Sequence, residues 1–150
     1  MRCLVLLLVF AGASGCDNTE TPTTPTPTPP TPVQTTVTFT GTLRSNAART
    51  FTFAASAGGT VSAAMKTVDF VTAPPQPDPD TPVTIPVIGF ALGRYNADAN
   101  TCTATVTFEQ AAANSFISAV ASGAGTFCLR VYDVGRVSDP LTFSVEVIHP

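Results

Sequence analysis

The chain carries few side chains of the kind that catalyse reactions. Nucleophilic catalysis by a serine or cysteine needs a base beside the nucleophile, most often a histidine. His149 is the only histidine, and it is the next-to-last residue of the sequence. Residues at a chain end are usually frayed and solvated, so we interpret His149 as an exposed residue without a catalytic role. We therefore predict that the protein is not an enzyme.

Acidic and amide side chains offer a second kind of chemistry, the binding of a hard metal ion. Asp78 and Asp80 lie two residues apart in "PDPD", and Asn96, Asp98 and Asn100 alternate in "NADAN". Such groups of oxygen ligands suit calcium, but neither group matches the twelve-residue EF-hand loop. Asp and Asn also favour turns on their own account. We predict solvated turns and no metal or other cofactor, with calcium kept as the alternative.

The first sixteen residues have the three regions of a secretion signal. Met1 and Arg2 supply a positive charge, residues 4–10 form an apolar run, and residues 11–15 are small. The apolar stretch is shorter than the roughly 20 residues that a transmembrane helix needs. The sequence therefore predicts export rather than a membrane-spanning helix.

The end of this signal, Ala13-Ser14-Gly15-Cys16, resembles the lipobox of bacterial lipoproteins, with Ala13 where that family usually has Leu. The resemblance implies that residues 1–15 are removed and that Cys16 becomes the lipidated first residue. The protein would then be exported and held at a membrane of the bacterial cell envelope by its N-terminal lipid. The alternative is an ordinary signal peptide that leaves Cys16 as a free thiol.

A proline-rich segment follows the signal and separates it from the rest of the chain. Proline has no backbone N–H and restricts the residue before it to extended conformations, which favours a stiff polyproline-like rod. We predict a stalk over residues 16–36 and a single globular domain over residues 37–150. The prolines of the stalk are Pro22, Pro25, Pro27, Pro29, Pro30 and Pro32.

The composition favours β-structure and argues against a nucleic-acid partner. Charged residues make up 11% of the chain and hydrophobic residues 44%, with 10 Phe and no Trp. Aromatic and β-branched residues suit the half-buried surface of a pleated sheet. The formal net charge is −3 and no basic cluster is present, so a phosphate backbone has nothing to bind.

The globular part shows the alternation of apolar and polar residues that is typical of β-strands. Strands recurring every 10 to 15 residues between turn residues predict an all-β fold, an antiparallel β-sandwich of jelly-roll type. Residues 72–86 contain six prolines and are predicted to form an exposed loop. About eight strands are expected, over residues 37–43, 49–55, 59–68, 86–95, 102–110, 114–121, 125–135 and 141–149.

The order of these segments resembles the bacterial pre-peptidase C-terminal (PPC) domain, a small β-sandwich of exported proteins. The resemblance rests on "FTGTL" (39–43), "RTFTFAASAGGTVSAAM" (49–65), "PVIGFALGRYNADAN" (86–100) and "SGAGTFCLRVYDVG" (122–135). It implies a β-sandwich of the same kind. No peptidase segment stands among these 150 residues, and a role in protease targeting is not carried over from the family. Calcium binding is not carried over either, because no ligand position of the family can be matched to a residue here.

Two cysteines remain for the exported domain once Cys3 leaves with the signal and Cys16 is acylated. Cys102 and Cys128 are predicted to form a disulfide, as is usual in an oxidising compartment. Two free thiols or a two-ligand metal site are the alternatives. By strand alternation Cys128 faces away from its apolar neighbours, whereas Cys102 shares a face with Val106. The pairing therefore requires either that Cys102 lies in the turn before its strand or that a bulge intervenes.

The only two tyrosines each lie beside an arginine, Arg94 with Tyr95 and Arg130 with Tyr132. If exposed, these four residues are candidates for a surface that recognises a sugar or a peptide. The alternative is that Tyr132 covers the second face of its sheet or an edge.

Our leading hypothesis is a lipid-anchored, non-enzymatic binding or adhesion module that engages polysaccharide or protein at the cell envelope. The alternative is a structural or accessory lipoprotein that supports a separate secreted enzyme or an envelope assembly. A hydrolase that uses an unrecognised pair of carboxylates is a third hypothesis, and no motif in the sequence favours it.

Overall fold

The computed structural model describes residues 31–72 and 86–150, which fold into eight strands and no helix. All eight predicted strands are present, with small shifts at their ends, so the all-β prediction is confirmed. The first strand begins at Thr35, inside the segment that was predicted to be stalk. The strands are β1 (Thr35–Leu43), β2 (Ala48–Ala55), β3 (Gly59–Phe70), β4 (Ile88–Asn96), β5 (Thr101–Ala111), β6 (Phe116–Ala121), β7 (Gly125–Tyr132) and β8 (Leu141–His149).

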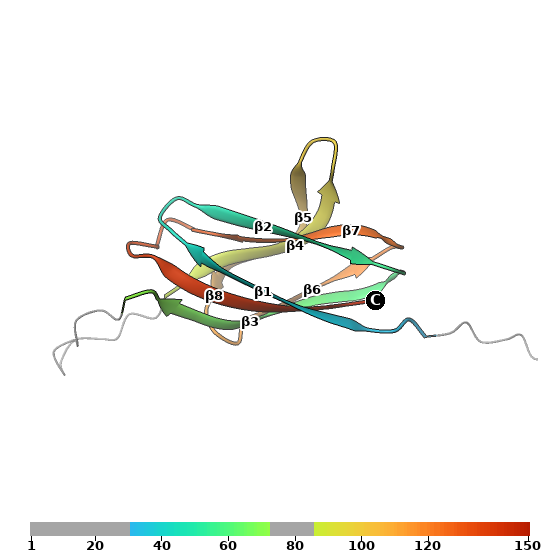
Figure 1. The fold of residues 1–150 in the computed structure, drawn as a ribbon, viewed down its shortest axis with the longest axis horizontal. Helices are drawn as coiled ribbons and strands as arrows, with labels where there is room; N and C mark the ends of the chain where they lie inside the picture. The colour runs from blue at the N-terminus through green and yellow to red at the C-terminus, as the bar shows by residue number, and fades with distance from the viewer. Residues whose placement is uncertain (1–30, 73–85) are drawn as a thin grey trace, which may run out of the picture. The chain divides into compact units, whose positions relative to one another are not determined.

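The strands form two antiparallel sheets of four. Figure 1 shows the two sheets as two layers. We call the sheet with the order β1-β8-β3-β6 sheet A and the sheet with the order β2-β7-β4-β5 sheet B. Only β4 and β5 are neighbours both in sequence and in a sheet, because every other connection crosses from one sheet to the other. This is the strand order of an eight-stranded jelly roll, and the fold prediction is confirmed.

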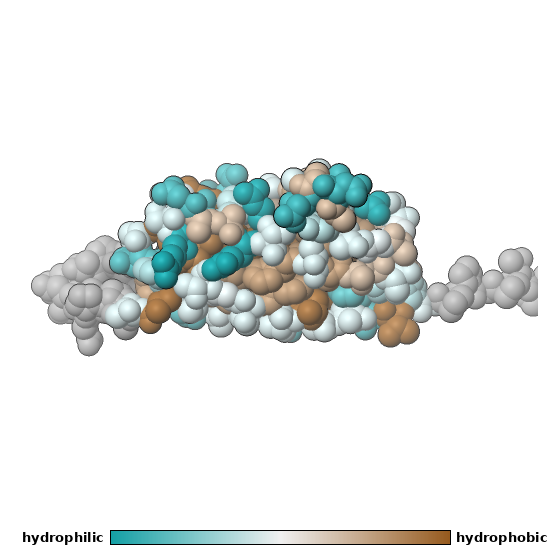
Figure 2. All heavy atoms as spheres, turned by 45° about the horizontal axis from the view of Figure 1, so that its top comes forward, coloured by the Kyte–Doolittle hydropathy of each residue, from teal (hydrophilic) through white to brown (hydrophobic). Residues whose placement is uncertain are grey.

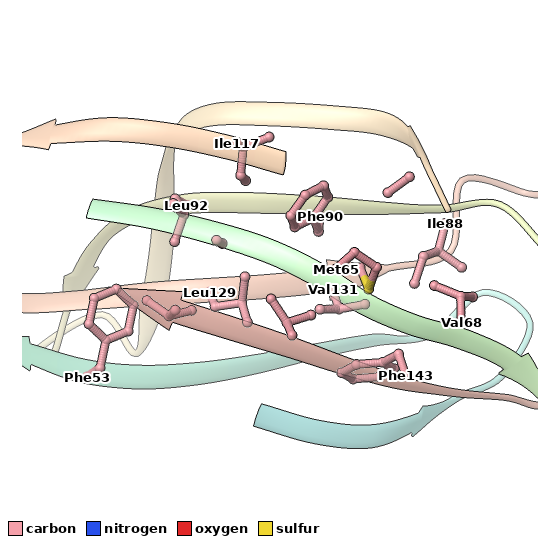
Figure 3. Packing of buried hydrophobic residues seen from close by; sticks show 14 of the residues in the cluster. Phe53, Met65, Val68, Ile88, Phe90, Leu92, Ile117, Leu129, Val131 and Phe143 are labelled. Carbon is pink, nitrogen blue, oxygen red and sulfur yellow. The ribbon is translucent and has the colours of Figure 1, made fainter. Parts of the chain in front are cut away.

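The core lies between the two sheets and follows from the two-residue period of the strands. In β8, Leu141, Phe143, Val145 and Val147 are buried, while the residues between them are more exposed. Figure 3 shows Met65 and Phe143 of sheet A and Phe90 and Leu129 of sheet B among these side chains. Burial of apolar area on both inner faces is what holds the two sheets together.

The sandwich has two long sides, where an edge strand of one sheet lies beside an edge strand of the other. We call the side formed by β1 and β2 the aromatic side and the side formed by β5 and β6 the open side. Figure 2 shows one face of the molecule, where hydrophobic side chains form a band between hydrophilic clusters. On the aromatic side, Phe39 and Phe51 are half-buried and pack on the core.

Several predicted features lie outside the described residues. These are the signal and Cys16, the stalk as far as Pro30, and residues 73–85 of the predicted loop with Asp78 and Asp80. In the part of the chain that the structure describes, no helix is long and apolar enough to cross a bilayer.

Candidate binding surface

The outer face of sheet B presents the second arginine–tyrosine pair. Leu129 and Val131 of β7 point into the core, so Arg130 and Tyr132 point to the other side, as strand alternation requires. Arg130 is exposed and Tyr132 is half-buried. The guanidinium of Arg130 lies 5.4 Å from the centroid of the Tyr132 ring, a distance at which a cation is attracted to the ring.

Small residues of β4 make room for this tyrosine. The register pairs Gly89 with Tyr132 and Ala91 with Arg130. A Cβ atom on Gly89 would lie 2.5 Å from a carbon of the Tyr132 ring, so only glycine lets the ring lie this close to the sheet. We call Gly89, Ala91, Arg130 and Tyr132 the Tyr132 shelf. Both earlier interpretations of Tyr132 hold in part, since its ring covers the sheet and remains partly exposed.

Burial and nearby charges shift the pKa of the Tyr132 phenol. Burial raises the pKa of the Tyr132 phenol, the Glu109 carboxylate raises it further, and Arg130 lowers it in part. The phenol is therefore protonated at neutral pH and can donate one hydrogen bond and accept others. With the Arg130 guanidinium and the Glu109 carboxylate both near the ring, the surface offers charged groups of both signs beside an aromatic side chain.

The first arginine–tyrosine pair lies elsewhere. Tyr95 is six residues beyond Gly89 along β4, which corresponds to about 20 Å in an extended strand. Its hydroxyl donates a hydrogen bond of 2.5 Å to Oδ1 of Asn100. The guanidinium of Arg94 lies 5.3 Å from the ring centroid of the core residue Phe127, on the face of β4 opposite to Tyr95. Of the four predicted residues, the structure therefore brings together only Arg130 and Tyr132.

A hollow lies beside Arg94 on the open side. It is lined by Phe53, Val61, Leu92, Thr105, Val120 and Phe127 among others, and its volume is about 70 Å³. A water molecule occupies about 30 Å³ of liquid, so this hollow can hold a few waters. Pockets for small ligands are several times larger, and we do not assign a ligand to it.

The "NADAN" segment forms the turn that closes the β4–β5 hairpin. Oδ1 of Asn96 accepts a hydrogen bond from the backbone N–H of Ala99 at 3.1 Å, and Oδ1 of Asn100 accepts the bond from Tyr95. Asn100 has a φ of 50°, a conformation that asparagine tolerates better than most residues. Of the three candidate calcium ligands in this segment, Asn96 and Asn100 therefore form hydrogen bonds within the turn, and Asp98 is exposed. Within residues 31–72 and 86–150, no group of three or more His, Cys, Asp or Glu side chains is placed to hold a metal ion.

Cys102 and Cys128 form a disulfide, with their Cα atoms 5.8 Å apart. The bond joins β5 to β7, two strands that lie on either side of β4 in sheet B. Cys128 is fully buried. The predicted pairing is confirmed, and the free-thiol and metal-site alternatives are excluded for these two residues.

A bulge in β5 resolves the conflict of strand faces that the sequence presented. Leu92 pairs with Val106, but the next residue of β4 pairs with Ala104, which leaves Thr105 as an extra residue in β5. One extra residue reverses the side to which the following residues point. Cys102 therefore faces away from Val106, even though it lies within the strand and not in the turn before it.

Asp133 is a residue whose role the sequence analysis missed. Its Oδ1 atom accepts hydrogen bonds from the backbone N–H groups of Gly135, Arg136 and Val137, and its Oδ2 atom accepts one from Asn46. Burial alone would raise the pKa of the Asp133 carboxyl, but the four donors together outweigh it and hold the pKa below its usual value. The carboxylate thereby joins the β1–β2 turn to the loop after β7. An Asp followed two residues later by Gly, as here, is a sequence signal for such a turn.

The prediction that His149 is frayed and solvated was wrong. The residue belongs to β8, pairs with Thr35 of β1 and is only 6% exposed. Its ring centroid lies 5.0 Å from that of Phe53, and its Nδ1 atom lies 3.1 Å from the backbone oxygen of Pro150. Pairing of β8 with β1 over their full length buries the side chain.

Comparison with known proteins identifies no family for this chain. No protein-family model matches it, and a search of curated proteins finds no match either. Among the solved structures that are similar, one comes from work described as "Bacillus endospore appendages form a novel family of disulfide-linked pili". It shares 14% sequence identity over 78% of this chain and 86% of that chain, with a TM-score of 0.38. At this level the likeness supports no inference about function, and the resemblances to lipoproteins and to the PPC domain stay predictions.

Proposed function

We propose that this protein is an exported, lipid-anchored binding or adhesion module, held at the bacterial cell envelope through Cys16 and without catalytic activity. The observation that carries the proposal is the disulfide between Cys102 and Cys128. Disulfides of this kind persist in oxidising compartments, which agrees with export by the N-terminal signal. Because Cys102 and Cys128 bond to each other and Cys3 would be removed with the signal, no cysteine is left to pair with Cys16. The thiol of Cys16 then remains available for the lipid.

The Tyr132 shelf supports a role in binding. Tyrosine and arginine are the residues that most often contribute binding energy at protein interfaces. Here they lie on an open sheet face beside Glu109, a geometry that suits an extended polymer better than an enclosed small molecule. We propose polysaccharide or protein of the envelope as the ligand.

The anchor is tested by labelling growing cells with radioactive palmitate. We expect the protein to incorporate the label and Cys16→Ala to lose it, because Cys16 is the cysteine that directly follows the small residues of the signal. Ser14→Ala is the matched control and should retain the label. Equal labelling of wild type and Cys16→Ala would contradict the proposal.

The binding surface is tested by screening the purified protein against glycans and envelope proteins. Tyr132→Ala and Arg130→Ala should each weaken binding of any ligand found, by about tenfold or more for residues at the centre of an interface. Thr50→Ala is the matched control, because Thr50 is an exposed residue of β2 that lies opposite Arg130 of β7 and is not part of the shelf. Binding that all three substitutions leave unchanged would exclude the shelf.

A further inference from the structure

The edge strand β6 exposes hydrophobic side chains to an unusual degree. Phe116 is 61% exposed and Val120 is 79% exposed. Their strand neighbours Ile117 and Ala121 are buried in the core. Because successive side chains of a strand point to opposite faces, Phe116 and Val120 lie on the outer face of sheet A. The strand, "FISAVA", contains no charged residue, no proline and no glycine.

The opposite edge on the same side of the sandwich is built differently. Strand β5 shows two register shifts against β4 and carries Glu109. Bulges and charges of this kind keep an exposed edge from pairing with another chain. Strand β1, at the far edge of sheet A, is uncharged as well, but its outward side chains are threonines such as Thr38 and Thr40. Within the described residues, β6 is therefore the edge that combines exposed apolar side chains with an uninterrupted strand.

The backbone groups that β6 leaves free can be assigned from its pairing with β3. The N–H of Met65 donates to the oxygen of Ser115, and the register continues with Ala63 opposite Ile117. Hydrogen-bonded pairs recur at every second residue of an antiparallel ladder, so Ile117 bonds to β3. The N–H and C=O groups of Phe116, Ser118 and Val120 accordingly point away from the sheet.

We propose that β6 pairs with β6 of a second copy of this chain, antiparallel and around a twofold axis at Ser118. In this register Ser118 lies opposite Ser118 of the second copy, and Phe116 lies opposite Val120 of the second copy. Every free N–H and C=O of Phe116, Ser118 and Val120 then finds a partner. Aromatic and β-branched side chains are favourable cross-strand neighbours, and no like charges meet. The two copies of sheet A become one continuous sheet of eight strands.

The sequence of the strand is what selects a second copy as the occupant. A twofold contact brings the strand opposite itself and must be complementary to itself. "FISAVA" meets this requirement because it carries no charge, so no like charges face each other across the axis, and because its three outward-pointing backbone positions are all paired in this one register.

The size of this contact sets its strength. Six residues form a strip about 20 Å long, which is smaller than the roughly 800 Å² per partner of a standard stable interface. We therefore expect a weak dimer in solution. If both copies are anchored to one membrane, as the proposed function has it, their effective concentration rises and pairing is favoured.

Sedimentation of the full chain with Cys16→Ala tests pairing without the lipid. The protein should change from monomer to dimer as its concentration rises toward about 1 mM, the range of weak interactions. Ser118→Lys places two positive charges opposite each other and should weaken association by about tenfold or more. Thr38→Lys, on the outer face of β1 in the same sheet, is the matched control and should change nothing. A monomer at every concentration, or a dimer that Ser118→Lys leaves intact, would overturn the proposal.

Cross-linking tests the register in the anchored protein. Paired residues of hydrogen-bonded type have Cα atoms about 5.5 Å apart, within the range of a disulfide. Mild oxidation of membranes carrying Ser118→Cys should give a reducible dimer, whereas Thr38→Cys should give none. Equal cross-linking of both variants would contradict the register. If the wild type is not labelled by palmitate, the proposed anchor is wrong, but sedimentation of the unlipidated protein still tests β6 pairing. Failure of the proposed function is therefore distinguishable from failure of β6 pairing.

Discussion

The two long sides of the sandwich are filled with side chains to different degrees. On the aromatic side the rings of Phe39 and Phe51 stack with centroids 4.9 Å apart, and Phe51 meets Phe143 edge to face at 6.1 Å. Such aromatic pairs add to the free energy gained from burial alone. The gap between β1 and β2 is thereby filled with side chains from both sheets.

The open side has fewer such contacts between the sheets, and its edge strand β5 is cross-linked within its own sheet. Phe108 is 41% exposed, Phe116 and Val120 more so, and a hollow lies between the sheets. The disulfide of Cys102 holds β5 to the centre of sheet B. The comparison teaches that the aromatic side is closed by side chains packed between the two sheets, whereas the open side is cross-linked only within sheet B and leaves apolar surface available.

The largest effect is expected from removing a buried ring on the aromatic side. Phe143→Ala should lower the free energy of unfolding by about 3–5 kcal/mol, since a fully buried phenylalanine leaves a cavity. Chemical denaturation measures this. A loss below 1 kcal/mol, within the range of surface substitutions, would show that this side is not closed by packing.

Removing the cross-link should have the next largest effect. The disulfide closes a loop with a sequence separation of 26 residues, for which the chain-entropy model gives about 3.5 kcal/mol. The double variant Cys102→Ala, Cys128→Ala should be destabilised by up to this amount in urea denaturation. Reductant should destabilise the wild type similarly and leave the double variant unchanged. If reductant left the free energy of unfolding of the wild type unchanged, the disulfide would not stabilise the fold as we infer.

Asp133 should give a smaller effect that depends on pH. Its carboxylate ties the β1–β2 turn of the aromatic side, so Asp133→Asn should cost about 1–2 kcal/mol at neutral pH. Because the folded-state pKa is lowered, the stabilisation is present above the unfolded pKa and is lost as pH falls through the folded pKa. Denaturation curves of wild type and variant should converge in acid. A difference that is constant with pH would show that the charge has no part in it.

The smallest effect is expected at the exposed edge. Phe116→Ser should change the free energy of unfolding of the monomer by no more than about 0.5 kcal/mol, as for surface sites without special contacts. Its contrast with Phe143→Ala separates exposed from buried phenylalanine within sheet A. A loss comparable to that of Phe143→Ala would mean that Phe116 is part of the core.

The fold and the disulfide could be predicted from the sequence because both depend on local information. Strands such as β1 and β8 alternate strictly between core and solvent, and the turn residues between them mark their ends. Cys102 and Cys128 could be paired by elimination among four cysteines. The bulge at Thr105 was predicted only as one of two ways to reconcile their faces, since an extra residue becomes visible only against a partner strand.

The candidate site could be predicted only in part. Strand alternation correctly placed Arg130 and Tyr132 on the outer face of β7, but it could not show that Arg94 and Tyr95 lie far along β4 from them. The local turn of Asp133 with Gly135 could have been predicted from the sequence, but its bond to Asn46 could not, because the two residues are 87 positions apart.

What the sequence by itself determined is the alternation of each strand and hence the all-β class, together with the cysteines available for a bond or an anchor. These follow from the two-residue period of an extended chain and from composition. Only the tertiary structure decided that His149 is buried, that Tyr132 lies on Gly89, and that the apolar strand β6 is left at an edge. The physical reason is that burial and exposure depend on which strands become neighbours, and in a jelly roll nearly all neighbours are distant in sequence.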